Sequence, residues 1–322
     1  MKAIVYRDSG SPDVLQCEQI EKPLPGDNEV LIKVRAAALN PLDWRLMRGG
    51  PALVQLLLGG RKPKRMGRDV AGEVEAVGSK VTQLKRGDAV FGGCRGALAD
   101  YVCASESAVA SKPENLTFEQ AASVPIAGWT ALQGLRDKGH VQPGQRVLIN
   151  GAAGGVGTFA VQIAKYLGAD VTGVCSTRNV EMVRGIGADH VLDYTLEDFT
   201  KGDARYDLIL DCIANHSPNE VRRVLQPKGK CVLVGAPHDV GLIALLVGLM
   251  KLLVMAPFTS QKVVTMMARR SQGDLKFLAG LMQEGKVTPV IDRCYGFGDT
   301  AEAVRYLEEG HARGKVVVTV AA

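Results

Sequence analysis

The chain has 322 residues, of which 46% are hydrophobic and 23% are charged, and its formal net charge is +5. This length suffices for two domains with sizeable cores, and the composition is that of an ordinary globular protein. The mild charge gives no ground for a nucleic-acid partner, and we interpret the local basic cluster between Arg61 and Arg68 as a solvated loop.

Cysteine usage and the ends of the chain bear on the compartment. The seven cysteines are scattered and form no CxxC pair, which argues against a disulfide framework and fits a reducing compartment. The first six residues resemble the start of a strand rather than a signal or transit peptide, so we expect a cytoplasmic protein. An apolar run at 240–258 is interrupted by Lys251 and by glycines, and we expect a buried helix followed by a strand at 252–256. Membrane contact is the alternative, but the run is too short and too interrupted to predict an integral membrane segment.

The first 125 residues are β-rich. Short β-branched stretches are separated by turns that contain proline or glycine, which predicts a small barrel or a folded sheet. The expected strands are 3–6, 30–36, 71–77, 89–91 and 101–104.

From residue 118 onward the pattern changes to an interrupted helix at 119–135 and then to alternating strands and helices. The expected strands are 146–150, 170–175, 190–192, 208–211 and 230–234, and the expected helices are 156–167, 180–185 and 219–225. Strict alternation predicts a doubly wound parallel sheet of the Rossmann type. Helices at 274–283 and 299–308 and strands at 290–295 and 315–320 follow. We therefore expect an α/β protein with a β-rich domain at 1–125 and 270–322 and a Rossmann domain at 126–269.

The turn from Gly151 to Gly157 reads Gly-Ala-Ala-Gly-Gly-Val-Gly and lies between a buried strand and an Ala/Val-rich helix. In that context glycines let the backbone approach a pyrophosphate, and the helix N-terminus attracts the anion. The sequence therefore predicts a dinucleotide site. Its central residues are Ala153, Gly154, Gly155 and Val156.

The end of the second strand of this domain distinguishes the two nicotinamide dinucleotides. An NAD site places an acidic residue there, whereas this chain has Ser176, Arg178 and Asn179. A hydroxyl and a guanidinium suit a 2′-phosphate, so we expect NADPH. Tyr194 follows the third strand and either closes over the same phosphate or packs in the core.

A metal site is not visible in the sequence. The cysteines and the five histidines form no ligand pattern of the kind that zinc requires, and we predict a metal-free enzyme. Without a Lewis acid, polarising a simple ketone is harder, which favours a substrate that needs only hydride and an available proton, such as a quinone or an enone.

Several motifs together resemble the medium-chain dehydrogenase/reductase superfamily, and specifically its zinc-free quinone oxidoreductase branch, over essentially the whole chain. They are Glu29–Val34, Ala38–Trp44, Gly67–Gly72, Gly87–Gly92, Gln120–Pro125, Gly128–Ala131, Gly187–Tyr194 and Gly310–Lys315, besides the glycine turn. The resemblance implies a GroES-like β-rich domain and a Rossmann domain, with the active site between them, and a homodimer.

The resemblance also implies residue roles. In zinc-containing relatives a Cys near Asn40, a His near Arg68 and a Glu near Asp69 hold the metal, and this chain lacks the Cys and the His. Asn40, Asp43 and Thr130 are the expected catalytic residues. Asn40 and Thr130 are also expected to contact the cofactor, together with Arg45, Gly235, Ala236, Met255 and Lys315.

Asp43 and Arg68 could form a buried ion pair in the space that a metal would fill; the alternative places Arg68 in the solvated basic cluster. The predicted function is NADPH-dependent hydride transfer to a small apolar electrophile, either a quinone or an α,β-unsaturated carbonyl. The alternatives are a zinc-independent alcohol or aldehyde reductase and a non-catalytic NADPH-binding sensor or structural protein.

Overall fold

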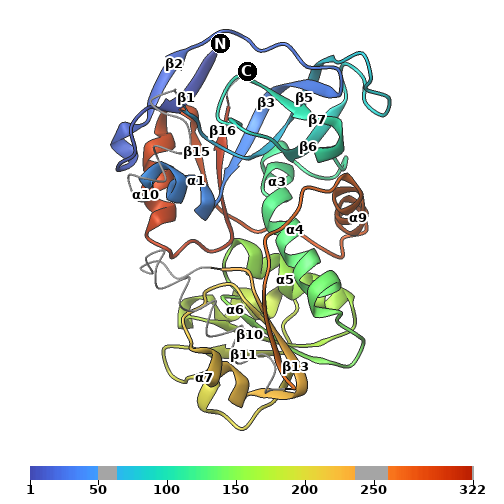
Figure 1. Ribbon diagram of the computed structural model, residues 1–322, viewed down its shortest axis with the longest axis vertical. Coiled ribbons are helices and arrows are strands. Elements are labelled where there is room, and N and C mark those ends of the chain that lie inside the picture. The colour runs from blue at the N-terminus through green and yellow to red at the C-terminus, as the bar shows by residue number, and fades with distance from the viewer. Residues whose placement is uncertain (50–63, 236–259, 321–322) are drawn as a thin grey trace. The chain divides into compact units, whose positions relative to one another are not determined.

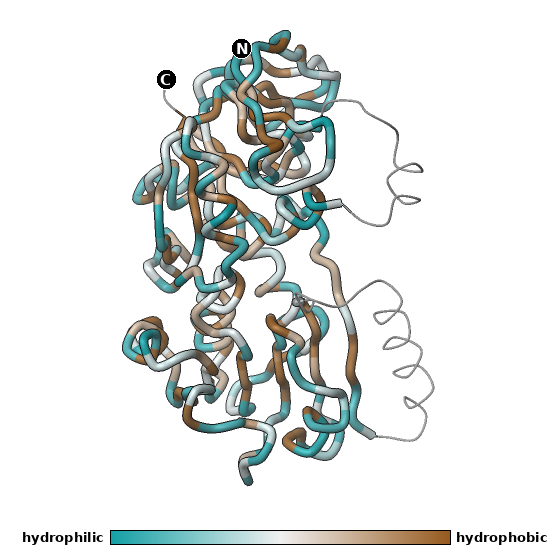
Figure 2. The backbone as a smooth tube through the Cα atoms, turned by 90° about the vertical axis from the view of Figure 1, so that its left-hand side faces the viewer, coloured by the Kyte–Doolittle hydropathy of each residue, from teal (hydrophilic) through white to brown (hydrophobic). Residues whose placement is uncertain are grey.

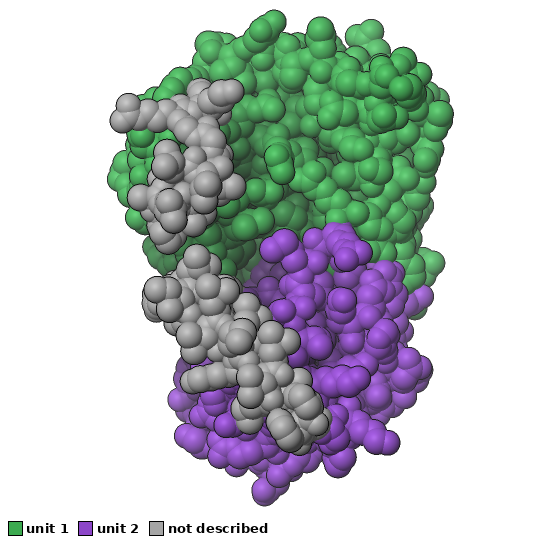
Figure 3. Space-filling model, viewed as in Figure 1, with its two compact units in different colours: residues 1–129, 270–322 green, residues 130–269 purple. Residues whose placement is uncertain are grey.

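The computed structural model describes residues 1–49, 64–235 and 260–320 (Figure 1). The apolar run at 240–258, Ala236 and Met255 lie outside these ranges. The chain divides into two compact units, residues 1–129 with 270–322 and residues 130–269 (Figure 3). We retain the assignment of these regions to a catalytic and a cofactor-binding domain as a proposal.

The first unit is built on a seven-stranded sheet centred on β3 (Glu29–Leu39). The path is β15-β16-β3-β5-β6-β8, and β7 also pairs with β3. The other strands are β5 (Asp69–Val77), β6 (Ala89–Gly93), β7 (Tyr101–Ser105), β8 (Val109–Ser111), β15 (Ile291–Gly296) and β16 (Lys315–Thr319). Buried Val and Ile side chains from β3, β5 and β16 fill its core, as the GroES-like β-rich prediction requires.

Two pairings of β3 position the candidate site. Strand β16 runs antiparallel to β3 with Val316 opposite Leu39, which places Lys315 beside Asn40. Strand β5 pairs on the other side of β3 with Asp69 opposite Ala38. Residues from three distant parts of the chain therefore meet at one end of β3.

A smaller sheet and short helices complete the first unit. The sheet has the order β2 (Gln16–Gln19), β1 (Lys2–Tyr6) and β4 (Lys64–Arg65). The α-helices are α1 (Pro41–Arg48), α3 (Phe118–Ala122), α9 (Gln272–Gln283) and α10 (Thr300–Glu308), and α4 (Pro125–Leu132) crosses the boundary between the units. The 3₁₀ turns are η1 (Pro12–Val14), η2 (Glu106–Ala108) and η7 (Phe297–Asp299).

The second unit contains a six-stranded parallel sheet of order β11-β10-β9-β12-β13-β14, which is the Rossmann order and confirms the predicted fold class. Its strands are β9 (Arg146–Asn150), β10 (Asp170–Cys175), β11 (His190–Asp193), β12 (Tyr206–Asp211), β13 (Leu225–Leu233) and β14 (Lys262–Thr265). Its helices are α5 (Gly155–Tyr166), α6 (Val180–Gly185) and α7 (Pro218–Arg223), with η3 (Gln133–Gly139), η4 (Thr177–Asn179) and η5 (Phe199–Lys201). Figure 2 shows hydrophobic residues along these strands, as expected for a sheet covered on both faces.

Several elements differ from the sequence expectations. The helix expected at 119–135 is divided before Pro125 and continues past Leu132 as a π-helix to Gly139. The helix expected at 219–225 ends at Arg223, because Leu225 already pairs with Tyr206 as the start of β13. Strands β2, β4, β8 and β14 were not expected. Among the described helices, none combines the length and apolar character needed to cross a bilayer.

Candidate active site

The first unit holds a buried polar cluster at the end of β3. The ammonium of Lys315 donates to Asn40 Oδ1 at 2.7 Å and to Asp69 Oδ2 at 3.2 Å. The Asn40 amide nitrogen donates to the same Asp69 oxygen at 2.9 Å, and the backbone N–H of Ile126 donates to the other at 3.1 Å. Lys315 is 3% exposed, Asn40 is 4% exposed and Asp69 is fully buried.

Burial and pairing act in opposite directions on this cluster. Burial raises the pKa of Asp69, while the Lys315 ammonium and the hydrogen bonds from Asn40 and Ile126 favour its ionised form. Because both oxygens of Asp69 accept hydrogen bonds, we assign the cluster as a carboxylate–ammonium pair bridged by an amide. The Asn40 side chain is thereby fixed, with its oxygen toward Lys315 and its nitrogen toward Asp69.

Asp43 lies one helical turn away, at the start of α1. Its carboxylate accepts the backbone N–H of Asn40 at 2.9 Å, which caps the helix, and Pro41 occupies the first helical position. Burial raises the pKa of Asp43 to about 7, and the neighbouring Asp69 adds to this effect. Arg68 Nε lies 3.7 Å from Asp43 Oδ1, and its side chain is 24% exposed. The hypothesised pair is therefore present, but only its acidic member is buried.

The ammonium of Lys315, rather than Arg68, contacts both Asn40 and Asp69. Sequence reasoning gave Lys315 a cofactor contact and did not predict these hydrogen bonds, since 275 residues separate Lys315 from Asn40. Among the described residues, no group of three or more His, Cys, Asp or Glu side chains is placed to hold a metal ion.

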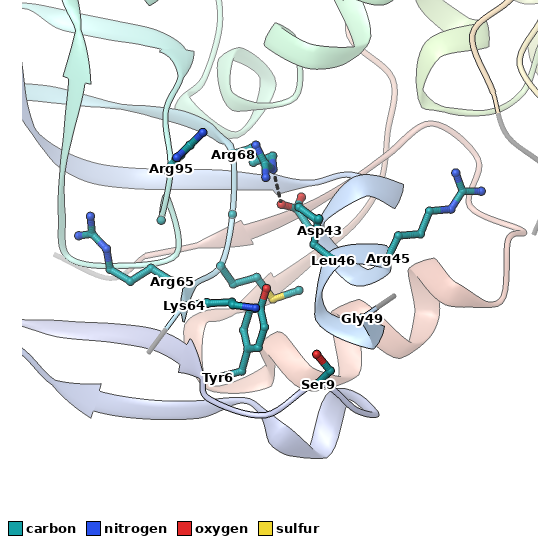
Figure 4. Close-up of a pocket in the computed structure, with 13 residues that line it drawn as sticks. Tyr6, Ser9, Asp43, Arg45, Leu46, Gly49, Lys64, Arg65, Arg68 and Arg95 are labelled. Carbon is teal, nitrogen blue, oxygen red and sulfur yellow. Dashed lines mark ion pairs between the residues drawn. The ribbon is translucent and has the colours of Figure 1, made fainter. Parts of the chain in front are cut away.

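Asp43 and Arg68 also line a cavity of about 690 Å³ in the first unit. Figure 4 shows the cavity between α1 and the segments around residues 64–68 and 95–96, with Asp43 facing Arg68. Among the described residues, the other ionisable side chains on its wall are Tyr6, Arg45, Lys64, Arg65 and Arg95. Arg45 is half-buried and extends away from Arg68 in this view.

In the second unit, the glycine turn follows β9 at the point where the strand order reverses. Gly151 has a φ of +83°, and a Cβ at Gly157 would lie 2.1 Å from the Gly151 carbonyl oxygen, so both positions require glycine. A Cβ at Gly154 would have only the Gly151 oxygen nearby, at 3.5 Å. The first amides of α5 have no intrahelical acceptor and suit a phosphate, so this turn fits a dinucleotide.

The end of β10 carries the residues expected to select the cofactor. Ser176 Oγ accepts from the Asn179 side chain at 3.1 Å, Asn179 is buried, and Arg178 is exposed. Asp193 ends the neighbouring strand β11, and its carboxylate accepts from Thr195 N at 2.9 Å and from Thr195 Oγ1 at 2.7 Å. A hydrogen bond from Thr177, followed by those from Thr195, lowers the pKa of Asp193. The Asp193 carboxylate is thus engaged by its own loop.

A second buried carboxylate supports the neighbouring strand end and was missed from sequence. Asp211, at the end of β12, accepts from Asn150 Nδ2 at 2.8 Å and from the backbone N–H groups of Ile213 and Ala214. Asn150 ends β9 directly before the glycine turn. Asp211 therefore holds together the two strand ends at which a Rossmann sheet binds its ligand.

The remaining expected residues lie as follows. Thr130 is 9% exposed on α4, and Ala153 is buried in the glycine turn. Gly235 follows β13, where a Cβ would lie 2.0 Å from the Cys212 carbonyl oxygen. Tyr194 is 58% exposed, so packing in the core of this unit is not its role.

Comparison with known proteins matches residues 26–114 to the alcohol dehydrogenase GroES-like domain and residues 186–318 to the zinc-binding dehydrogenase family. The chloroplast envelope quinone oxidoreductase homolog of Arabidopsis thaliana is 33% identical over 99% of this chain and 98% of its own. The chloroplastic NADPH-dependent alkenal/one oxidoreductase of the same plant is 37% identical over 99% of this chain and 79% of its own. The quinone oxidoreductase from Coxiella burnetii superposes with a TM-score of 0.87 at 33% identity, covering 100% of this chain and 99% of its own.

The zinc that one family description implies does not fit the residues present here. An additional cation between Asn40 and Asp69 would meet the Lys315 ammonium, which already bonds both side chains. Arg68 places a second positive charge beside Asp69 in the sequence and pairs with Asp43. The matches nevertheless extend over both units and the whole length of the chain. Two family models, near full-length relatives and the Rossmann strand order agree, and the chain belongs to the medium-chain dehydrogenase/reductase family, in the group of its quinone oxidoreductases and enone reductases.

Proposed function

We propose that this protein is an NADPH-dependent reductase of quinones and α,β-unsaturated carbonyls. The observation that carries the proposal is the glycine turn at the switch point of a Rossmann sheet, in a chain related over its full length to reductases of these two substrate classes. When bound, NADPH supplies a hydride to the β-carbon of an enone or to a quinone, solvent supplies the proton, and NADP⁺ and the reduced product leave.

We assign the cofactor phosphates to the second unit. The amides that open α5 hold the pyrophosphate, and Ser176 and Arg178 bind the 2′-phosphate. The absence of an acidic residue directly after β10 and the engagement of Asp193 by Thr195 support NADPH over NADH. Tyr194 is exposed near the same loop and is available to cover the phosphate, and Gly235 lets the cofactor approach the end of β13.

We assign the reacting end of the substrate and cofactor to Asn40, Asp43 and Thr130. The Asn40 amide is held by Lys315 and Asp69, so it is preorganised and cannot reorient when a ligand binds. Lys315 acts here as a positioning residue, because its ammonium donates to Asn40 and to Asp69 inside a buried cluster. We retain a homodimer and a cytoplasmic location as predictions.

The test is a substrate panel followed by loss of NADPH absorbance. We expect turnover of simple quinones and of α,β-unsaturated ketones and aldehydes, with little turnover of saturated aldehydes. Turnover of saturated aldehydes alone would identify an alcohol or aldehyde reductase instead. NADPH binding without turnover on any substrate would identify a binding protein and overturn the proposed function.

A further inference from the structure

The cavity of the first unit carries more positive charge than its own side chains neutralise. Its described lining includes the five cations Arg45, Lys64, Arg65, Arg68 and Arg95. The only carboxylate on this lining is Asp43, which faces Arg68 at 3.7 Å. A cavity of about 690 Å³ has the size of a small-molecule site, and the few polar groups on the wall of such a site set its specificity. The excess of cations therefore identifies the chemistry that the cavity accepts.

Backbone hydrogen bonds bring these cations together. Gly96 and Ala97 donate to the Gly67 carbonyl at 2.8 and 3.1 Å, and Cys94 donates to the Arg68 carbonyl at 2.8 Å. The loop that carries Arg95 is thereby joined to the segment that carries Arg65 and Arg68. Gly67 and Gly96 both have positive φ values, of +91° and +83°, so each turn requires glycine.

Three of the cations lack an acidic partner within the described residues. Lys64, Arg65 and Arg95 form no ion pair with any carboxylate that the structure describes. The sequence between the two lining segments, residues 50–63, contains no Asp or Glu. Holding like charges together costs free energy, and a bound anion offsets that cost.

The cavity adjoins the buried cluster of the candidate active site. Asp43 lies on the cavity wall and caps the backbone N–H of Asn40, and Arg68 precedes Asp69 in the chain. An anion bound by Arg65, Arg68 and Arg95 is therefore close to Asn40 and Asp43, two of the residues that we assign to the reacting end. The cofactor phosphates are assigned, under the proposed function, to the second unit, at the glycine turn and the end of β10.

We propose that this cavity binds a carboxylate or phosphate group of the electrophilic substrate, so that the preferred acceptor is an enone or quinone that carries an acid group. The inference rests on the proposed function and narrows it. Planar guanidinium groups bind such anions through paired charge-assisted hydrogen bonds, which a neutral analogue cannot form.

The experiment compares 6-oxohept-4-enoate with its methyl ester, in which two methylene groups separate the acid group from the reacting C=C bond, so that the two differ in charge and not in intrinsic reactivity. The variants are Arg65→Gln and Arg95→Gln, and the matched control is Arg86→Gln, an exposed arginine outside the cavity. We expect the wild type to have the higher kcat/KM for the acid. Each cavity variant should lower the acid-to-ester ratio of kcat/KM roughly ten-fold or more, the value of one charge-assisted hydrogen bond. Arg86→Gln should leave the ratio unchanged.

Three results would overturn the inference. The first is a wild-type acid-to-ester ratio of kcat/KM near one, and the second is a ratio that neither cavity variant changes. The third is a rise in the KM of NADPH in the cavity variants without a change in that ratio, which would assign the cavity to the cofactor phosphates. Turnover of the ester measures reductase activity in the absence of the acid group. If the wild type reduces the ester and shows no preference for the acid, only this inference is refuted. Failure to reduce the acid, the ester or any quinone refutes the proposed function itself.

Discussion

Replacing Lys315 with methionine tests the buried cluster directly. The change removes two hydrogen bonds, to Asn40 at 2.7 Å and to Asp69 at 3.2 Å, and leaves the fully buried Asp69 carboxylate without its counter-charge. Hydrogen bonds to charged groups contribute about 1.5 to 3 kcal/mol each. Breaking one side of a buried pair costs about 3 to 5 kcal/mol, so we expect the free energy of unfolding to fall by that amount.

The assay can be restricted to the unit that contains the cluster. Both tryptophans, Trp44 and Trp129, belong to the first unit, so tryptophan fluorescence during urea unfolding reports on that unit. Lys286→Met is the matched control, because Lys286 is exposed and its loss should change stability by less than about 0.5 kcal/mol.

A double variant separates charge from packing. Adding Asp69→Asn to Lys315→Met removes the uncompensated carboxylate and should recover more than half of the lost stability. A Lys315→Met variant within about 1 kcal/mol of the Lys286→Met control would refute the account, since a buried unpaired carboxylate cannot be so well tolerated.

Three further predictions concern Asp43, the glycine turn and cofactor choice. The pKa of Asp43 in the folded state, about 7, lies above its ordinary value of 3.8. Between these two pH values the folded protein binds a proton that the unfolded chain has released. The free energy of unfolding therefore falls as the pH rises from about 4 to about 7. Asp43→Asn should therefore gain stability relative to wild type as the pH rises from about 4 to about 7, and parallel urea midpoints would contradict this. Gly154→Ala should fold normally but bind NADPH more weakly in a fluorescence titration. Gly157→Ala should also lose stability, because its Cβ would lie 2.1 Å from the Gly151 carbonyl oxygen. Equal stabilities of the two variants would be inconsistent with this geometry. Arg178→Ala should raise the Kd of NADPH roughly ten-fold or more with little effect on NADH, and an equal loss for both cofactors would assign Arg178 no role at the 2′-phosphate.

The elements of the second unit that follow from local patterns could be predicted closely. Strands β9 and β10 and helix α6 begin and end at the expected residues, because continuous apolar runs and glycine turns determine them. The first residue of β13 could not be predicted from a local pattern. Leu225 pairs with Tyr206 but Lys230 pairs with Leu208, and the residues between form an irregularity with Lys228 at positive φ, which in sequence resembles a loop. Strand β14 has four residues and pairs only with β13 at the sheet edge, so its partner rather than its own pattern defines it.

The site was predictable where one segment supplies it and not where distant segments meet. The glycine turn and the Ser176–Asn179 segment could be proposed from adjacent residues. The bonds of Lys315 to Asn40 and Asp69 depend on the pairing of β16 and β5 with β3, and nothing local indicates them. The basic cluster between residues 61 and 68 was interpreted as a solvated loop. Arg61 and Lys62 lie outside the described residues, Arg65 is exposed, and Lys64, Arg65 and Arg68 line a cavity together with Arg95, which the sequence did not indicate.

Transfer of deuterium from NADPH that carries deuterium at both C4 positions is the most direct test of the proposed reductase. With an α,β-unsaturated ketone as substrate, the product is examined by NMR for the position of the label. We predict a saturated ketone with deuterium on the former β-carbon. Deuterium on the carbonyl carbon of an allylic alcohol would contradict this account and identify a carbonyl reductase, and so would the absence of any labelled product from a protein that binds NADPH.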